Sequence, residues 1–130
     1  MSEKISVLLI DDEPIVGKRL TPALSKMGCQ IEAFQDSLSA VKRLDEKEFD
    51  IVVTDVRLED MDGIEILDLV RKKSEKTEVI IMTGFAMMEL ARKAVEKGAF
   101  DFIEKPFKAH ELQAVISRAV ETLGKKLPSL

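Results

Sequence analysis

The sequence contains no tryptophan, no tyrosine, one cysteine and one histidine among its 130 residues. Because Cys29 is the only cysteine, no internal disulfide can form, which is typical of proteins in a reducing compartment. The first apolar run is short and ends in acidic residues, so neither a signal peptide nor a membrane span is predicted. These absences lead us to expect a cytoplasmic protein that has no contact with a membrane.

A basic stripe is also absent. The formal net charge is -4, and nothing in the charge pattern suggests direct binding to nucleic acid. Hydrophobic residues make up 45% of the chain and charged residues 34%, which is typical of a soluble globular protein. The length fits one domain, which we place at residues 1–123, with residues 124–130 as a C-terminal tail or the start of a linker.

Short apolar runs alternate with amphipathic stretches along the whole chain. Runs rich in β-branched residues predict five strands, at residues 5–10, 30–34, 51–54, 79–82 and 100–103. Between and after them, helical spacing of apolar residues predicts five helices, which include Ile15 in the first and Leu38 in the second. A strict β-α alternation predicts an α/β fold: a parallel sheet with right-handed crossovers and helices on both faces.

A polar signal follows each of the five runs, with Asp36 after the second. The other four runs are followed by Asp11 and Asp12, then Asp55, Thr83 and Lys105. Because a parallel sheet places the carboxyl ends of its strands at one edge, we expect these side chains to share one cleft. Asp12 and Asp55 could ligate Mg²⁺ directly, with Asp11 reaching it through water. Thr83 and Lys105 could bind the oxygens of a phosphoryl group. The cluster therefore predicts aspartyl-phosphate chemistry, with Asp55 as the nucleophile.

Each of these residues also has a plainer interpretation when it is taken alone. Asp11 and Asp12, like Thr83, could cap a helix, and an isolated Lys105 would be a solvated surface lysine. The only histidine, His110, stands at a helix start away from any acidic site, so we interpret it as a surface residue.

Four motifs in order resemble the receiver domain of two-component response regulators: LLIDDEP, IVVTDVRLEDMDG, VIIMTGFA and GAFDFIEKPF. The resemblance covers the chain from about Ile5 to Leu123. The residues of these motifs are similar to those of receivers that precede AAA+ transcription activators. It implies a flavodoxin-like (βα)5 doubly wound sheet with strand order 2-1-3-4-5. It also implies a stand-alone receiver or a fragment of a larger regulator.

The resemblance assigns the acidic residues. It implies that Asp55 accepts a phosphoryl group from a phosphohistidine of a sensor histidine kinase, and that the domain promotes its own phosphorylation and dephosphorylation. It further implies that Mg²⁺ is held by Asp11, Asp12, Asp55 and the backbone carbonyl of Arg57. One departure from the family pattern is Glu59, where the family often has proline.

The remaining assignments concern the switch. The resemblance implies that Thr83 and Lys105 contact the phosphoryl group, that Phe102 is a rotating aromatic residue, and that Lys105–Pro106 is a cis peptide. Phosphorylation would then repack the surface of the fourth helix, fifth strand and fifth helix. That surface would contact an unknown output domain or protein, and the resemblance also allows a dimer formed through it.

Two other functions compete with this one. A module of the same fold could bind proteins without responding to phosphate, although the complete set of polar residues argues against it. A small Mg²⁺-dependent phosphatase would use the same nucleophile, but such enzymes typically show an Asp-x-Asp pattern, whereas the first strand here ends in Asp-Asp-Glu.

Overall fold

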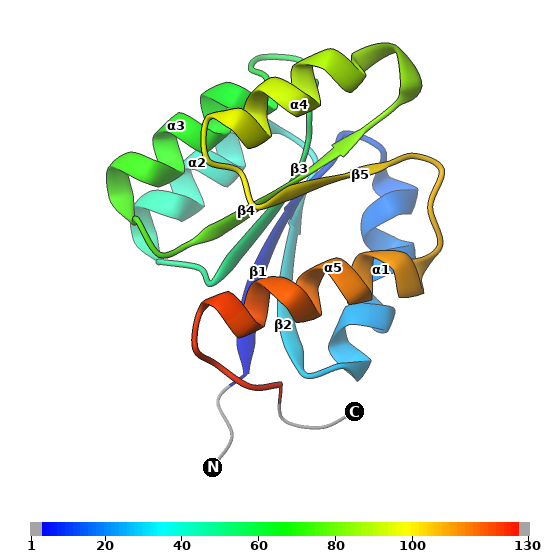
Figure 1. Cartoon of the computed structure of the whole chain (residues 1–130), viewed down its shortest axis with the longest axis vertical. Helices are drawn as coiled ribbons and strands as arrows, with labels where there is room; N and C mark the ends of the chain where they lie inside the picture. Colours follow the sequence, from blue (N-terminus) through cyan, green and yellow to red (C-terminus); the bar gives the residue numbers. More distant parts are fainter. Residues whose placement is uncertain (1–3, 128–130) are drawn as a thin grey trace.

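A computed structural model describes residues 4–127 and contains one sheet of five parallel strands (Figure 1). The strands are β1 (Ile5–Ile10), β2 (Cys29–Phe34), β3 (Ile51–Asp55), β4 (Glu78–Thr83) and β5 (Asp101–Glu104). Their order in the sheet is β2-β1-β3-β4-β5. This confirms the predicted flavodoxin-like topology, and it leaves β2 and β5 at the two edges.

Each strand is followed by a helix: α1 (Pro14–Lys26), α2 (Ser37–Glu46), α3 (Gly63–Lys73), α4 (Met88–Glu96) and α5 (Ala109–Thr122). Local chemistry sets the boundaries. Proline stands at the start of α1, where its missing N–H costs nothing. The carboxylate of Asp36 accepts a hydrogen bond from the backbone N–H of Ser39, 2.7 Å away, and so caps α2. The helix predicted between the fourth and fifth strands begins as a short 3₁₀ turn, η1 (Phe85–Met87), and becomes α-helical only at Met88.

The helices cover both faces of the sheet, as predicted (Figure 1). Along β1, Val7 and Leu9 pack on the side of α1 and α5, whereas Leu8 and Ile10 pack on the side of α2, α3 and α4. This alternation follows from the period of two in a strand. Because both faces of the central strands are buried, β1, β3 and β4 are mostly apolar between their ends, whereas the edge strand β2 is only partly buried and carries Gln30 and Glu32.

Two apolar residues that helical spacing placed on buried faces are exposed. Ile15 and Leu38 each expose 66% of their surface. In the first part of α2 the fully buried residue is instead Ala40. Both residues lie in the first turn of a helix, and they point away from the core, because their neighbours Val16 and Ser37 in the same turns are the ones that pack inward. The prediction was therefore wrong for these two side chains, although the helices themselves are present.

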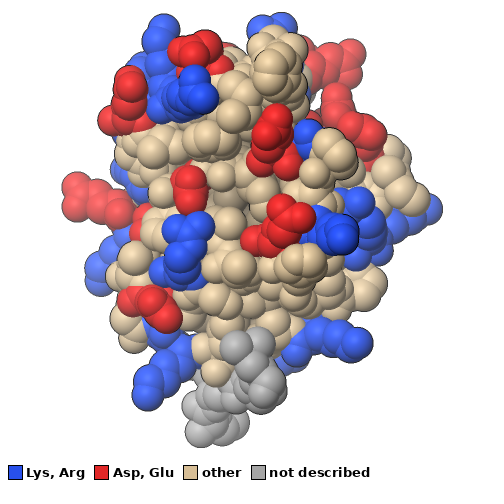
Figure 2. Space-filling model, turned by 45° about the vertical axis from the view of Figure 1, so that its right-hand side comes forward, with Lys and Arg blue, Asp and Glu red and all other residues tan. Residues whose placement is uncertain are grey.

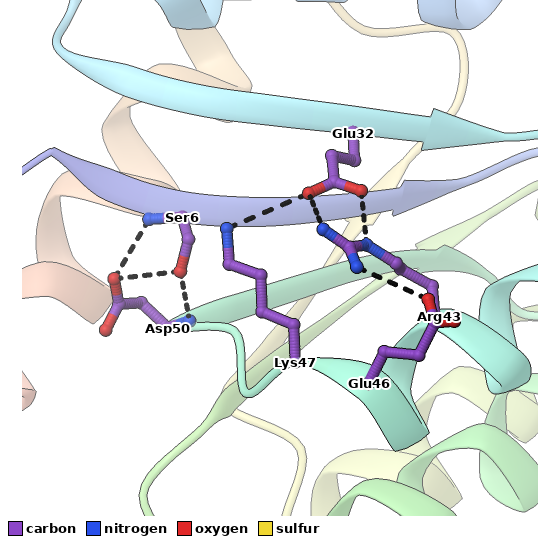
Figure 3. Close-up of polar contacts among 6 residues, drawn as sticks. All are labelled: Ser6, Glu32, Arg43, Glu46, Lys47 and Asp50. Atoms are coloured by element: carbon purple, nitrogen blue, oxygen red, sulfur yellow. Dashed lines mark hydrogen bonds and ion pairs between the residues drawn. The ribbon is translucent and has the colours of Figure 1, made fainter.

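Charged side chains cover the outside. On the face shown in Figure 2, basic and acidic residues are interspersed, and no basic stripe is seen on it. A local cluster joins α2 to the edge strand β2, because the guanidinium of Arg43 donates to both carboxylate oxygens of Glu32, at 2.7 and 3.1 Å (Figure 3). Within residues 4–127, no helix is long and apolar enough to cross a membrane.

Candidate functional site

The predicted site residues come from the carboxyl ends of β1, β3, β4 and β5. Asp11 follows β1 directly, Asp55 and Thr83 are the last residues of β3 and β4, and Lys105 follows β5. The backbone N–H of Lys105 donates to the carbonyl of Thr83 at 2.7 Å, which extends the β4–β5 pairing as far as the site. The parallel sheet therefore aligns four segments that are far apart in the sequence.

Lys105 lies between two of the carboxylates. Its Nζ is 2.6 Å from Oδ2 of Asp11 and 3.0 Å from Oδ2 of Asp55. Only 3% of Asp11 is exposed, so its charge depends on this ion pair for compensation. One ammonium group shared between two carboxylates leaves the site with an excess of negative charge.

A third carboxylate adds to that excess. Asp11, Asp12 and Asp55 can each bring one oxygen within 4.8 Å of the others, and Asp12 is exposed to solvent. Carboxylate oxygens are the ligands that a hard divalent cation prefers, and Mg²⁺ keeps several waters, which an exposed position permits. The donor set therefore fits Mg²⁺, and the like charges give a reason for a cation to bind there.

The electrostatics of the site are visible in two pKa shifts. Burial raises the pKa of the Asp55 carboxyl above its usual value and the charge of Asp11 adds to this, although Lys105 opposes the shift. Burial lowers the pKa of Lys105, but its hydrogen bonds to Asp11 and Asp55 outweigh that effect and raise it. The lysine is thus firmly charged, whereas the Asp55 anion is held in an unfavourable environment.

Backbone donors orient both carboxylates. The N–H of Glu13 donates to Oδ1 of Asp11 at 2.9 Å, and the N–H of Arg57 reaches Oδ1 of Asp55 at 3.4 Å. Glu13 also brings Oε1 to 4.0 Å from Nζ of Lys105. Sequence reasoning did not assign Glu13 to the site, although it is the third acidic residue in a row after β1.

A second unassigned residue, Gly63, begins α3 beside the acceptor strand. A Cβ atom at this position would lie 3.1 Å from Cα of Val56 and 3.3 Å from the carbonyl oxygen of Asp55, so these backbone atoms would have to move by a few tenths of an ångström. The N–H of Gly63 donates to the carbonyl of Val56 at 2.7 Å. Glycine therefore allows the loop after β3 to fold back tightly against Asp55. The signal in the sequence was the glycine that closes the segment DMDG.

The other predicted residues lie near the site but make different contacts. The hydroxyl of the fully buried Thr83 donates to the carbonyl of Gly84 at 2.9 Å. Phe102 is half-buried and packs against the core on the α4 side of the sheet. The Lys105–Pro106 peptide is cis, as the resemblance implied. The role of the Arg57 carbonyl as a ligand stays a prediction.

Comparison with known proteins gives a consistent result. Residues 7–117 match the family model described as response regulator receiver domain. The regulator NtrC of Proteus hauseri is 32% identical over 118 residues, which are 91% of this chain and 25% of that protein. FixJ of Bradyrhizobium diazoefficiens is 34% identical over 120 residues, 92% of this chain and 58% of that protein.

Solved structures agree with the sequence relatives. NtrX from Brucella abortus, crystallised in complex with ADP, has a TM-score of 0.87 at 32% identity and covers 94% of this chain and 28% of that one. A response regulator receiver domain protein from Clostridium thermocellum has a TM-score of 0.85 at 28% identity, covering 90% of this chain and 94% of that one. The chain spans about a quarter of the length of several curated relatives, NtrC included.

Proposed function

Because the chain belongs to the response regulator receiver domain family, we propose that it is a phosphoacceptor switch of a two-component system. Asp55 takes the phosphoryl group from a phosphohistidine of a sensor histidine kinase. The observation that carries this proposal is the single ammonium of Lys105, held within 3.0 Å of both Asp11 and Asp55 inside a cluster of three carboxylates. Such a site has a nucleophile and a cation, and its excess negative charge favours binding a metal.

In the proposed transfer, a carboxylate oxygen of Asp55 attacks phosphorus. The new P–O bond forms as the P–N bond to histidine breaks, and the imidazole leaves with the electron pair. Lys105 lies where it can stabilise charge on the phosphoryl oxygens. Asp11, Asp12, Asp55 and the carbonyl of Arg57 would hold Mg²⁺, which supplies further charge neutralisation at those oxygens when bound. Attack of water on phosphorus would later release phosphate and regenerate the carboxylate.

The response to phosphorylation would pass through Thr83 and Phe102. The phosphoryl group adds roughly two negative charges and strong acceptors beside Thr83. If the Thr83 hydroxyl turns from the carbonyl of Gly84 toward the phosphoryl group, the half-buried Phe102 can move into the space that Thr83 leaves. This would repack the surface of α4, β5 and α5, where an output domain or protein would bind, or a second copy of the chain. A shift of this kind requires that the phosphoryl group bind the active arrangement more tightly.

Intact mass spectrometry after incubation with Mg²⁺ and acetyl phosphate tests the proposal. We expect one added phosphoryl group in the native protein, and none in Asp55→Ala or in the presence of a chelator. Absence of an adduct after a rapid acid quench would instead support a module that ignores phosphate. Steady turnover of an external phosphomonoester would support a phosphatase.

A separate variant tests the switch. Phe102→Ala should still gain the phosphoryl group, because the Phe102 side chain is not one of the groups that would bind the metal or the phosphoryl group. Its backbone amide shifts in α4 and β5 should respond much less to phosphorylation than those of the native protein. If both uptake and response were unchanged in Phe102→Ala, the proposed role of this residue would be wrong.

A further inference from the structure

Arg71, in the last turn of α3, makes contacts at the end of the sheet opposite to the site. One guanidinium nitrogen, Nη2, donates to the carbonyl of Gly98 at 3.0 Å and lies 3.7 Å from Oε1 of Glu78. A second guanidinium nitrogen, Nη1, donates to the carbonyl of Thr77. A single side chain therefore joins the end of α3, the start of β4 and the turn that closes α4. The side chain is 26% exposed; its contact with Thr77 is partly buried, whereas its contact with Gly98 lies at the surface.

The end of α4 that Arg71 contacts is tightly held. Gly98 has φ = 119°, a conformation that favours glycine, and it reverses the chain into β5. The N–H of Ala99 donates to the carbonyl of Ala94 at 3.0 Å, and the N–H of Phe100 donates to Val79 in the sheet at 2.7 Å. Both alanines are buried. This end of α4 is thus fixed by backbone bonds, by packing and by Arg71.

The beginning of α4 differs in each of these respects. It starts as the 3₁₀ turn η1, and no side chain caps either η1 or α4. Phe85 exposes 85% of its surface, and no residue of η1 is buried. This end directly follows Thr83 and Gly84, so it lies next to the predicted phosphorylation site. One helix therefore joins a loosely held end at the site to a fixed end far from it.

The far end of α5 is attached to the same part of the sheet. Thr122, the last residue of α5, donates its hydroxyl to Oε2 of Glu78 at 2.6 Å, while the other oxygen of that carboxylate faces Arg71. Lys125 then binds Oδ1 of Asp50 at 2.6 Å. The ends of α4 and α5 thus share one set of polar contacts at the amino-terminal edge of the sheet.

We propose that Arg71 is a positioning residue: its contact with Gly98 fixes the far end of α4, so that phosphorylation displaces chiefly the end at Phe85. We call this arrangement, with one fixed and one displaced end, a lever. This inference rests on the proposed function only for the origin of the displacement. The anchoring by Arg71 is a property of the unphosphorylated protein and can be tested without a phosphoryl group. A uniform shift of the whole helix is the alternative that the lever excludes.

The first test measures residue-resolved amide hydrogen exchange by NMR in the unphosphorylated protein. Arg71→Met keeps the aliphatic part of the side chain but removes every guanidinium bond. We expect exchange at Gly98 and Ala99 to become about tenfold faster, because a charge-assisted hydrogen bond that closes the turn is lost. The matched control is Arg92→Met on α4 itself, whose guanidinium is exposed and pairs with Glu89 one turn away. It should leave these amides unchanged. Equal exchange in Arg71→Met and the native protein would overturn the anchor.

The second test compares amide shifts before and after phosphorylation with acetyl phosphate and Mg²⁺. In the native protein, shift changes should be concentrated between Gly84 and Leu90 and small between Ala94 and Ala99. In Arg71→Met they should spread to the second segment. Arg71→Lys should restore only part of the difference, because a flexible ammonium lacks the rigid planar fork with which the guanidinium holds several acceptors in fixed geometry. Equally large native changes at both ends of α4 would overturn the lever, even if Arg71→Met failed to fold. If the native protein took up no phosphoryl group, the proposed function would fail, while the exchange experiment would still decide the anchor.

Discussion

Two aspartates at opposite ends of β3 show how differently the amino-terminal and carboxyl-terminal edges of the sheet are built, that is, the edges where the strands begin and where they end. Asp50 directly precedes the strand, and its carboxylate accepts from the N–H and hydroxyl of Ser6, at 2.9 and 3.1 Å, and from Lys125 (Figure 3 shows the contacts with Ser6). Asp55 ends the strand and shares Lys105 with Asp11, and within residues 4–127 its carboxylate accepts one further hydrogen bond, a long one from the N–H of Arg57.

The pKa shifts of the two carboxyls have opposite directions. Burial pulls the pKa of Asp50 upward, but the hydrogen bonds from Lys125 and Ser6 outweigh it and lower the pKa. Burial raises the pKa of Asp55, and the charge of Asp11 adds to it. The fold therefore stabilises the anion of Asp50 at the amino-terminal edge and destabilises the anion of Asp55 at the carboxyl-terminal edge. A carboxyl whose pKa is raised within a cluster of charges is a candidate functional group, whereas the carboxylate of Asp50 is held by its hydrogen bonds.

The largest expected difference between the edges lies in the lysines that pair with these aspartates. Lys105→Met should slow phosphorylation by acetyl phosphate on the order of a hundredfold, because it removes a preorganised charge from the phosphoryl oxygens. Lys125→Met should leave that rate unchanged. Time-resolved intact mass spectrometry measures both. A similar loss of rate in the two variants would mean that the edges do not have separate roles.

Stability should respond in the opposite sense to the same substitution at the two aspartates. At pH 7, Asp50→Asn should lower the free energy of unfolding by about 1–2 kcal/mol, because hydrogen bonds to a charged acceptor are lost. Asp55→Asn should raise it by up to about 1 kcal/mol, because it removes a disfavoured anion. Urea denaturation gives both values. A destabilised Asp55→Asn protein would contradict the proposed electrostatics of the site.

Magnesium should act on one edge only. A cation that binds the folded state alone adds about 1.4 kcal/mol to stability at ten times its Kd. We expect this gain in the native protein and in Asp50→Asn, but not in Asp12→Asn, which lacks one of the three clustered carboxylates. Thermal denaturation with and without Mg²⁺ decides the matter, and an equal gain in all three proteins would place the cation elsewhere.

The smallest expected effect is the pH dependence of these stability differences. Ionised Asp55 has a folded pKa above its unfolded value, near 3.8, so its penalty is present at neutral pH and disappears as pH falls through the folded pKa toward 3.8. Asp50 has a folded pKa below 3.8, so its contribution is complete above that pH and is lost only below it. The advantage of Asp55→Asn should therefore vanish at a higher pH than the deficit of Asp50→Asn. The reverse order would refute the assignment of the two shifts.

Sequence reasoning predicted the carboxyl-terminal edge well, and there is a physical cause. Polar residues that interrupt apolar runs, such as Asp55 and Lys105, mark the point where a buried strand emerges at the edge, so the parallel topology alone brings them together. The resemblance to receivers then supplied their roles, which remain proposals. It also implied the cis Lys105–Pro106 peptide that the structure contains.

The amino-terminal edge was not predicted, because its contacts depend on the three-dimensional packing of the helices. Asp50 and Glu78 could be seen to precede or begin strands, but their partners Lys125 and Thr122 lie at the end of α5, and no local pattern relates them. Similarly, helical spacing could not show that Leu38 is exposed. The division at residue 124 remains a prediction, although Lys125 contacts the domain that ends before it.

The most direct test of the account is the position of the phosphoryl group on the chain. Acetyl phosphate and Mg²⁺ would load the protein, borohydride would reduce any acyl phosphate to homoserine, and peptide mass spectrometry would locate the change. We predict homoserine at position 55 alone, with no change at Asp50, which directly precedes the same strand at the amino-terminal edge. Homoserine at position 11, 12 or 50 while Asp55 stays intact would contradict the account, because a carboxylate other than that of Asp55 would then be the nucleophile.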